Sequence, residues 1–299
     1  MGTYAVTGAA SGIGAATTAV LRERGHRVVS VDREDAEVVA DLATPDGRAR
    51  AVREILAACS GRLNGVVPCA GLAGVTGADS ARLVSVNYFG AVEVVAGLRP
   101  ALAAAAAAGE PSAVVVLSSN SVTCQPGWDL GVARRCLAGD EPDARELAGA
   151  REAVLVYPAT KAALAWWVRR EGVTPDWIGA GVRLNAVAPG LVATPMTDGV
   201  RADPVLGRFA DRYPTAIGRP GRPEEVARTI AFLLSEEAGL LVGSVLVVDG
   251  GTDALTWPTR PRGRVLPAPL GGVTSSLVRT LPRLARLAGR SRGGGRGRG

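Results

Sequence analysis

The sequence contains one lysine and one histidine among 299 residues, and each scarcity excludes a class of site. A mechanism that needs a His–Asp or Cys–His pair is excluded, because His26 lies in a short polar turn before a predicted strand. The four cysteines form no C-x-x-C pair, and no cluster of histidines accompanies them to complete a zinc site. We therefore expect no metal, and reduced thiols of the kind found in cytoplasmic proteins.

Long hydrophobic runs are also missing. The longest candidate, residues 91–108, is interrupted by Glu93, Arg99 and Pro100, so we expect no membrane span. The amino terminus opens directly into a strand-like run at residues 3–6, without the basic and apolar regions of a secretory signal. We therefore expect a cytoplasmic protein.

Aromatic residues make up only 4% of the chain, although 47% of it is hydrophobic. The apolar mass is mainly Ala, Val and Leu, which suits helices packed on a Val-rich parallel sheet. Short apolar strands alternate with helical patterns, which predicts an α/β fold: a Rossmann-like, doubly wound parallel sheet with helices on both faces. The predicted strands are 28–32, 65–68, 114–118, 182–188 and 245–249, with helices at 13–24, 49–58 and 224–235.

Two segments stand apart from this single domain, which we place at residues 1–258. Residues 120–154 form an insertion between a strand and a helix. Residues 259–299 form a tail rich in Pro, Gly and Arg, for which we expect disorder. The net charge of +6 is the sum of +10 in residues 260–299 and −4 in the remainder, so the body is not a nucleic-acid-binding domain. Contact of the tail with anionic membrane is an alternative to a solvated tail.

A glycine-rich run follows the first predicted strand. It reads Thr-Gly-Ala-Ala-Ser-Gly-Ile-Gly, with glycines at 8, 12 and 14, and a helix begins within it. Glycine permits the tight turn and lets the backbone approach a pyrophosphate. The start of the helix presents free N–H groups to the phosphates. This pattern predicts dinucleotide binding by Gly8, Ser11, Gly12, Ile13 and Gly14.

An acidic residue follows at the end of the second predicted strand. Asp32 lies 18 residues after Gly14, where a carboxylate can accept hydrogen bonds from the adenosine ribose. A carboxylate repels a 2′-phosphate, so we favour NAD over NADP. The neighbouring Arg33 keeps NADP open.

Tyr157 and Lys161 are spaced i and i+4, so on a helix both point to one face. A phenol with a pKa of about 10 is a poor base at neutral pH, and a neighbouring ammonium together with the positive nicotinamide is expected to lower that pKa. Lys161 is the only lysine in a chain that otherwise uses arginine. A lone lysine at this spacing indicates a position where a compact ammonium is needed. We expect Tyr157 to exchange a proton with the substrate oxygen.

Together these motifs resemble the short-chain dehydrogenase/reductase family over about residues 1–256. The resemblance implies an NAD(P)-dependent oxidoreductase with a small-molecule alcohol or ketone as its substrate. It implies that Ser119, in Val-Val-Val-Leu-Ser-Ser, orients the carbonyl oxygen beside Tyr157. Asn87, in Val-Asn-Tyr-Phe-Gly, would hold a proton-relay water, and Lys161 would bind the nicotinamide ribose.

The resemblance also implies further cofactor contacts. The adenosine would be contacted by Asp41, Leu42, Ala70 and Gly71. The nicotinamide end would be contacted by Pro189, Gly190, Val192 and Thr194.

Two features depart from most family members. Pro68-Cys69 stands where the family has two asparagines, and 38 residues separate Ser119 from Tyr157. Such an insertion is similar to that of the 3α-hydroxysteroid dehydrogenase/carbonyl reductase subgroup, and coniferyl-type alcohol dehydrogenases look similar. The insertion could wall the pocket or block a helix-bundle interface used for tetramers, so a homodimer is the expected assembly.

We therefore expect interconversion of a secondary alcohol and a ketone, with a hydroxysteroid-like or polycyclic substrate. The alternatives are a coniferyl-type aromatic alcohol dehydrogenase and a biosynthetic ketoreductase. A non-catalytic dinucleotide-binding protein is a third, but such proteins usually lose the tyrosine or the lysine. Here Asn87, Ser119, Tyr157 and Lys161 are all present.

Overall fold

The centre of the structure is a parallel sheet of seven strands in the order β3-β2-β1-β4-β5-β6-β7. The structure is a computed structural model, and it describes residues 1–210 and 212–259. Every strand pair is parallel, which confirms the predicted doubly wound α/β fold. The strands are β1 (Thr3–Thr7), β2 (Arg27–Asp32), β3 (Val38–Val39), β4 (Gly65–Pro68), β5 (Ala113–Leu117), β6 (Arg183–Pro189) and β7 (Val245–Val248).

The predicted strands agree with the structure to within one residue at each end, apart from β3. The central strands β4, β5 and β6 are buried along their whole length, because helices cover both faces of the sheet. β3 is only two residues long and pairs Val38 with Val31 and Val39 with Asp32. So short a strand leaves no run of alternating or continuous apolar residues to detect.

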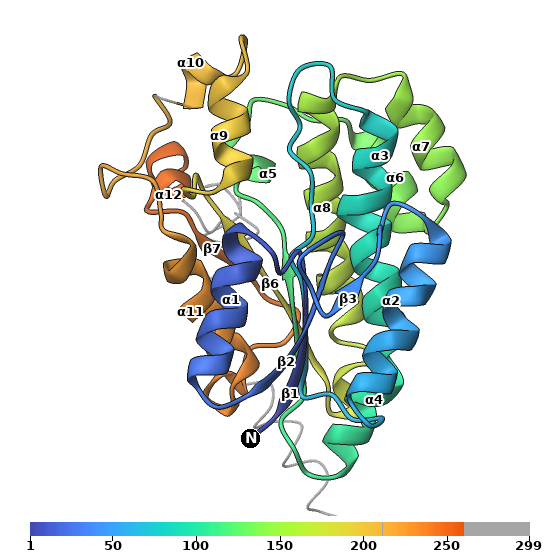
Figure 1. Ribbon diagram of the computed structural model, residues 1–299. Helices are drawn as coiled ribbons and strands as arrows, with labels where there is room; N and C mark the ends of the chain where they lie inside the picture. The colour runs from blue at the N-terminus through green and yellow to red at the C-terminus, as the bar shows by residue number, and fades with distance from the viewer. Residues whose placement is uncertain (211, 260–299) are drawn as a thin grey trace, which may run out of the picture. The chain divides into compact units, whose positions relative to one another are not determined.

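Helices form one layer on each face of the sheet (Figure 1). On one side α1 and α11 pack against each other, and their apolar residues share a core with β1 and β5. On the other side α2, α4 and α8 enclose the larger core. These helices are α1 (Gly12–Glu23), α2 (Pro45–Ala58), α4 (Gly90–Ala107), α8 (Ala153–Glu171) and α11 (Pro223–Leu234).

The predicted insertion folds into three helices, α5 (Ser121–Cys124), α6 (Leu130–Ala138) and α7 (Glu141–Gly149). α6 packs on α8, and α7 packs on the short helix α3 (Ser80–Val84). The side chain of Arg48 on α2, only 2% exposed, donates to Glu93 on α4 and to Glu141 on α7. A buried cation requires such partners, so this arginine ties the insertion to the body of the fold.

One compact unit covers Met1–Thr256, insertion included. The proposed boundary at residue 258 lies two residues beyond it. The expected disorder of the tail concerns residues that, from 260 onward, lie outside the described part of the chain.

One helical run, Ser80–Ala107, is long and apolar enough to cross a membrane by length and composition. Half of the hydrophobic window is buried inside the protein, and α4 packs against β4 and β5. Its apolar residues therefore have partners within the fold, as in a core helix.

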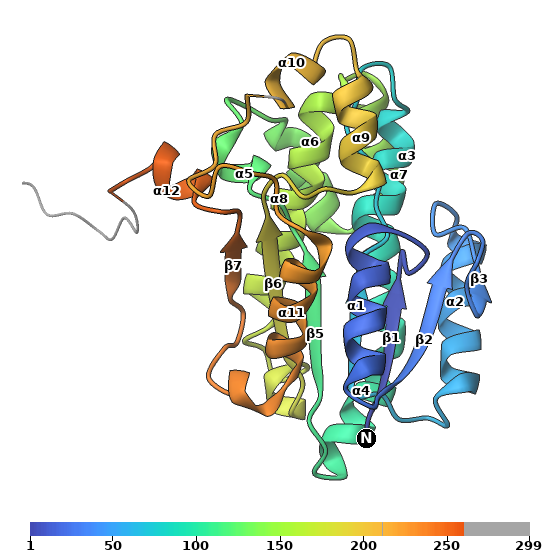
Figure 2. The same cartoon turned by 60° about the vertical axis from the view of Figure 1, so that its left-hand side comes forward.

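The loops and short helices that follow the strands gather at the carboxyl edge of the sheet (Figure 2). Parallel sheets bind ligands at this edge, where the loops from successive strands diverge. The elements found there include the π-helix η1 (Ser85–Phe89), α9 (Pro195–Ala202), α10 (Gly207–Ala210) and α12 (Thr252–Thr256). Two 3₁₀ turns, η2 (Ile178–Ala180) and η3 (Glu236–Ala238), complete the described elements.

Candidate functional site

A cavity of about 840 Å³ runs along the carboxyl edge of the sheet. It reaches from the glycine-rich loop after β1, past the ends of β4 and β5, to the segment after β6. All the predicted site residues except Asn87 line it. They are Gly8, Ser11, Gly12, Ile13, Gly14, Asp32, Arg33, Asp41, Leu42, Ala70, Gly71, Ser119, Tyr157, Lys161, Pro189, Gly190, Val192 and Thr194.

The glycine-rich loop forms a cradle in which a larger residue would not fit. Gly8 and Gly12 have φ values of +66° and +53°, a region that favours glycine. A Cβ on Gly14 would overlap the carbonyl oxygen of Gly8. Ser11 is the N-cap of α1, but its side chain does not cap the helix, so the first N–H groups of α1 are available to an anion. The residues present therefore fit the pyrophosphate of a dinucleotide.

Asp32 lies at the end of β2, beside this cradle. Its Oδ2 accepts a hydrogen bond from the backbone N–H of Ala10 at 3.0 Å, and its Oδ1 accepts from that of Arg33 at 2.7 Å. These bonds fix the carboxylate, and each oxygen keeps a lone pair that can accept from a ribose hydroxyl. This geometry supports the predicted role of Asp32.

The Asp41–Leu42 and Ala70–Gly71 segments line the part of the cavity where the family resemblance predicts the adenosine. Asp41 is held in place, because its carboxylate pairs with Arg82 of α3 at 2.9 Å and also accepts from the N–H of Ala43. Arg82 lines the cavity as well and was not among the predicted site residues. Nothing in its local sequence distinguishes it from the other arginines.

The end of β5 holds Lys161 at two points. Its ammonium donates to the carbonyl oxygen of Leu117 at 2.9 Å, and its own carbonyl accepts from the hydroxyl of Ser118 at 2.9 Å. The residue is only 5% exposed, and this burial lowers the pKa of the ammonium to about 8. The lone lysine is therefore shielded from solvent beside the cavity, and its ammonium loses its proton more readily than that of an exposed lysine.

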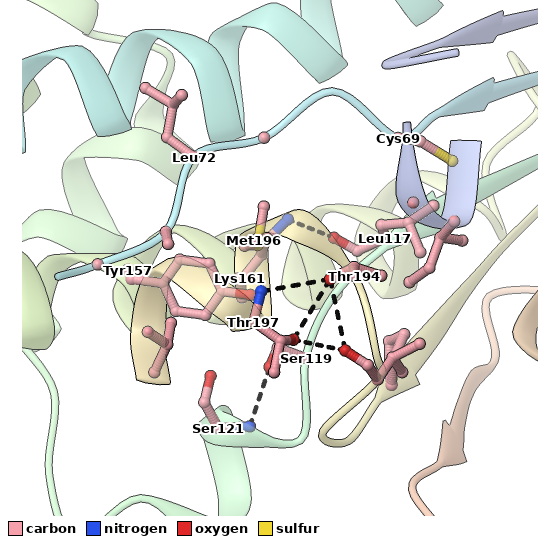
Figure 3. Close-up of a pocket in the computed structure, with 18 of the residues that line it drawn as sticks. Cys69, Leu72, Leu117, Ser119, Ser121, Tyr157, Lys161, Thr194, Met196 and Thr197 are labelled. Atoms are coloured by element: carbon pink, nitrogen blue, oxygen red, sulfur yellow. Dashed lines mark hydrogen bonds between the residues drawn. The ribbon is translucent and has the colours of Figure 1, made fainter. Parts of the chain in front are cut away.

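Tyr157 and Ser119 lie next to this lysine (Figure 3). Lys161 Nζ is 5.8 Å from the centre of the Tyr157 ring, and Ser119 Oγ accepts from the N–H of Ser121 at 3.1 Å. Burial raises the pKa of Tyr157, and a hydrogen bond with Ser119 partly offsets the rise. In the protein without a dinucleotide Lys161 does not lower this pKa, because its ammonium is directed to Leu117, and the fall expected with the nicotinamide bound stays a prediction.

Asn87 lies behind the cavity wall, within the π-helix η1. Its side-chain amide makes two hydrogen bonds to the backbone of Leu72. Oδ1 accepts from the Leu72 N–H at 2.7 Å, and Nδ2 donates to the Leu72 carbonyl oxygen at 3.0 Å. One lone pair of Oδ1 and one N–H of Nδ2 remain unused by these two bonds, so the expected water-holding role stays a prediction. What Asn87 does in this structure is fix the loop after β4 next to Gly71 and Lys161.

The segment after β6 lines the part of the cavity where the family resemblance predicts the nicotinamide. Thr194 caps α9 by accepting from the N–H of Thr197, and its methyl group lies opposite Gly12 of the cradle. Gly190 packs against Asp249, where a Cβ would approach the Asp249 side chain to 2.7 Å. The predicted residues at both ends of the cavity are thus brought to one surface.

Several cavity residues were not predicted. Cys69 faces Lys161, and burial raises the pKa of its thiol to about 12, so it stays protonated. Tyr213 lies in the loop after α10 and Cys124 in the short helix α5, and no local pattern reveals the conformation of either segment. Cys69 could have been found, because it occupies a position where the family has an asparagine.

Comparison with known proteins agrees with this geometry. A family model described as short chain dehydrogenase matches residues 3–130, and one described as enoyl-(acyl carrier protein) reductase matches residues 144–253. The chain is 40% identical to the 3-alpha-hydroxysteroid dehydrogenase/carbonyl reductase of Comamonas testosteroni, over 87% of this chain and all of that protein. It is 35% identical to the cis-4-hydroxycyclohexanecarboxylate dehydrogenase of Sinomonas cyclohexanicum, over 84% of this chain and 96% of that one.

A solved structure is also similar: the 3-alpha-hydroxysteroid dehydrogenase from Pseudomonas sp. B-0831, complexed with NADH. The TM-score is 0.80 at 44% identity, and the match covers 86% of this chain and 99% of that one.

The cradle predicts a specific effect of Gly14→Ala. The new methyl group overlaps the Gly8 carbonyl, so the turn must shift and NADH should bind at least about tenfold more weakly. Gly149→Ala is the matched control, because nothing lies within 4 Å of a Cβ there. NADH fluorescence titration measures both, and wild-type affinity in Gly14→Ala would contradict the assignment.

The pKa directions predict the titration of the protein without a dinucleotide. Because the pKa of Tyr157 is raised, its proton is retained to higher pH than in a free phenol. Lys161, with a pKa of about 8, is mostly neutral by then and cannot favour the phenolate. The difference in 295 nm absorbance between wild type and Tyr157→Phe should therefore show phenolate only above about pH 10. A step below pH 9 would show that Lys161 already acts on the phenol.

Proposed function

Because the chain belongs to the short-chain dehydrogenase/reductase family, we propose that it is an NAD(P)-dependent oxidoreductase that interconverts a secondary alcohol and a ketone. The observation that carries this proposal is one continuous cavity. A dinucleotide cradle forms one end, and Ser119, Tyr157 and Lys161 meet further along it. A protein that only bound dinucleotides would have no need of this second group.

In alcohol oxidation, the substrate hydroxyl lies between Ser119 and Tyr157. The Ser119 hydroxyl donates to the substrate oxygen and orients it, and the Tyr157 phenolate accepts the hydroxyl proton. Lys161 supplies positive charge that favours the phenolate once its ammonium leaves the Leu117 carbonyl. Bound NAD(P) supplies the ring that accepts or returns the hydride. In ketone reduction the Tyr157 phenol returns its proton to the substrate oxygen.

A bulky apolar substrate suits the rest of the cavity. Beyond the catalytic group the walls are mostly aliphatic, with contributions from the loop after β4, the insertion, α8 and the segment after β6. They include Leu72, Leu155, Met196, Val200 and Leu206. The relatives are named for hydroxysteroid and hydroxycyclohexane substrates, which share a ring-borne secondary hydroxyl. We propose a substrate of this class, with a coniferyl-type aromatic alcohol as the alternative.

NAD is the proposed cofactor, because the fixed Asp32 carboxylate lies where a 2′-phosphate would be repelled. We further propose a cytoplasmic homodimer, on the habit of the family. Light scattering after size-exclusion chromatography measures the assembly, and only monomer at micromolar concentration would dismiss the dimer.

The direct test is absorbance at 340 nm with NAD or NADP and a panel of hydroxysteroids, other cyclic secondary alcohols and cinnamyl-type alcohols. We expect turnover with NAD and a ring-borne secondary alcohol. In Tyr157→Phe we expect kcat to fall by at least about a thousandfold, since the proton acceptor is gone, while NADH binding stays within about twofold. Near-normal turnover in this variant would sink the mechanism, and dinucleotide binding without any turnover would favour a non-catalytic protein.

A further inference from the structure

α9, α10 and the residues that directly follow α10 form one wall of the substrate half of the cavity. Residues Met196, Val200, Leu206, Ala210 and Tyr213 of this segment all line the cavity. α9 and α10 lie at the carboxyl edge of the sheet, beyond the ends of the strands (Figure 2). We call residues 195–210 and 212–213 the roof segment. Its position decides how far the apolar half of the cavity is closed.

Asp203 joins the roof segment to the loop after β4. Its Oδ2 accepts from the backbone N–H of Thr76 at 2.7 Å, and its Oδ1 accepts from the Thr76 hydroxyl at 3.1 Å. The same Oδ1 accepts from the N–H groups of Val205 and Leu206, each at 2.8 Å. The Asp203 residue is buried, and these bonds, with that from Leu206 first, hold the pKa of its carboxyl below the usual range. It is therefore a charged acceptor that joins segments 127 residues apart.

The loop that carries Thr76 rests directly on the catalytic helix. A Cβ on Gly74 would approach both the Tyr157 Cβ and the carbonyl oxygen of Ala153 to 2.5 Å, so α8 and the loop are in close contact. The Asn87 amide fixes the start of the same loop at Leu72. Thr76 thus lies in a loop that is fixed by packing at Gly74 and by hydrogen bonds at Leu72, and its own hydrogen bonds to Asp203 connect the roof segment to this loop.

A second contact holds the other end of the roof segment. The hydroxyl of Tyr213 donates to Oδ1 of Asn120 at 2.7 Å, and Nδ2 of Asn120 donates to Oδ2 of Asp249 at 3.1 Å. An ionised carboxylate only accepts, so the Asn120 amide can take just this orientation. Asn120 is buried and directly follows Ser119, so the roof segment is tied to the residue next to the serine proposed to orient the substrate oxygen.

We propose that Asp203 is a positioning residue, which holds the roof segment closed over the substrate half of the cavity and so sets the affinity for the alcohol or ketone. Tyr213, through Asn120, holds the other end. The inference rests on the proposed function for its kinetic consequence, but the contact itself can be tested without turnover. Asp203 does not line the cavity, so the effect of replacing it should appear in KM more than in kcat.

The Asp203→Asn substitution tests the hydrogen bonds to Thr76 separately from those within the local turn. The amide oxygen can still accept from Val205 and Leu206, because these bonds need only one oxygen. The amide nitrogen replaces Oδ2 and meets the N–H of Thr76, so a donor faces a donor and the stronger of the two bonds to Thr76 is lost, which leaves only the bond from the Thr76 hydroxyl to the amide oxygen. Asp176→Asn is the matched control, because that carboxylate is 76% exposed and pairs with Arg99 far along the chain from the roof segment.

The first readout is tryptic cleavage after Arg208, an exposed residue of the roof segment. Loss of a charge-assisted hydrogen bond should raise the open population, so we expect cleavage about tenfold faster in Asp203→Asn than in wild type or Asp176→Asn. Unchanged cleavage at unchanged melting temperature would overturn the bridge, whatever the enzyme turns over.

The second readout is steady-state kinetics with the alcohol identified in the panel. We expect KM to rise about tenfold in Asp203→Asn, with kcat and NADH affinity within about twofold. Tyr213→Phe, which removes only the hydroxyl, should raise KM in the same direction. Equal losses in kcat and NADH affinity would mean that Asp203 merely supports the fold, and would overturn the positioning role. If the wild type turns over nothing, the proposed function fails, and the cleavage result still decides the bridge.

Discussion

The buried ammonium of Lys161 is the interaction around which the site is arranged. It is only 5% exposed, and the contact that holds it is the carbonyl of Leu117, at the end of β5. A charge so placed needs every nearby polar group to be correctly positioned. The Ser118 hydroxyl therefore fixes the lysine backbone by donating to its carbonyl oxygen. The low pKa that results lets the charge respond to whatever enters the cavity.

The topology of the sheet explains why residues far apart in the sequence meet at this lysine. Every strand is parallel, so the loops after β1, β4, β5 and β6 all emerge at the same edge. The loop after β1 supplies the cradle, that after β5 supplies Ser119, and that after β6 supplies the roof segment. The insertion adds a wall, and Arg48 anchors it through a buried charge that would be costly to leave unpaired.

The strands and the cofactor loop could be predicted because their causes are local. Apolar runs of four and five residues mark the buried strands β4 and β5, and backbone geometry requires Gly8, Gly12 and Gly14. Asp203 and Tyr213 could not be predicted, since their roles depend on partners 127 and 93 residues away. The pKa of Tyr157 was expected to fall because the spacing alone places an ammonium nearby. Spacing does not reveal that Leu117 holds this ammonium, or how far burial opposes ionisation.

The most direct test of this account is the kinetic effect of Lys161→Arg. Arginine keeps the positive charge that the chain uses everywhere else, but its guanidinium is wider and is not expected to lose its proton. If the site needs a compact ammonium that can lose its proton, kcat/KM should fall by about a hundredfold or more in Lys161→Arg. The melting temperature should stay near that of the wild type. A kcat/KM within about threefold of wild type would show that any cation serves at this position, and would contradict the account.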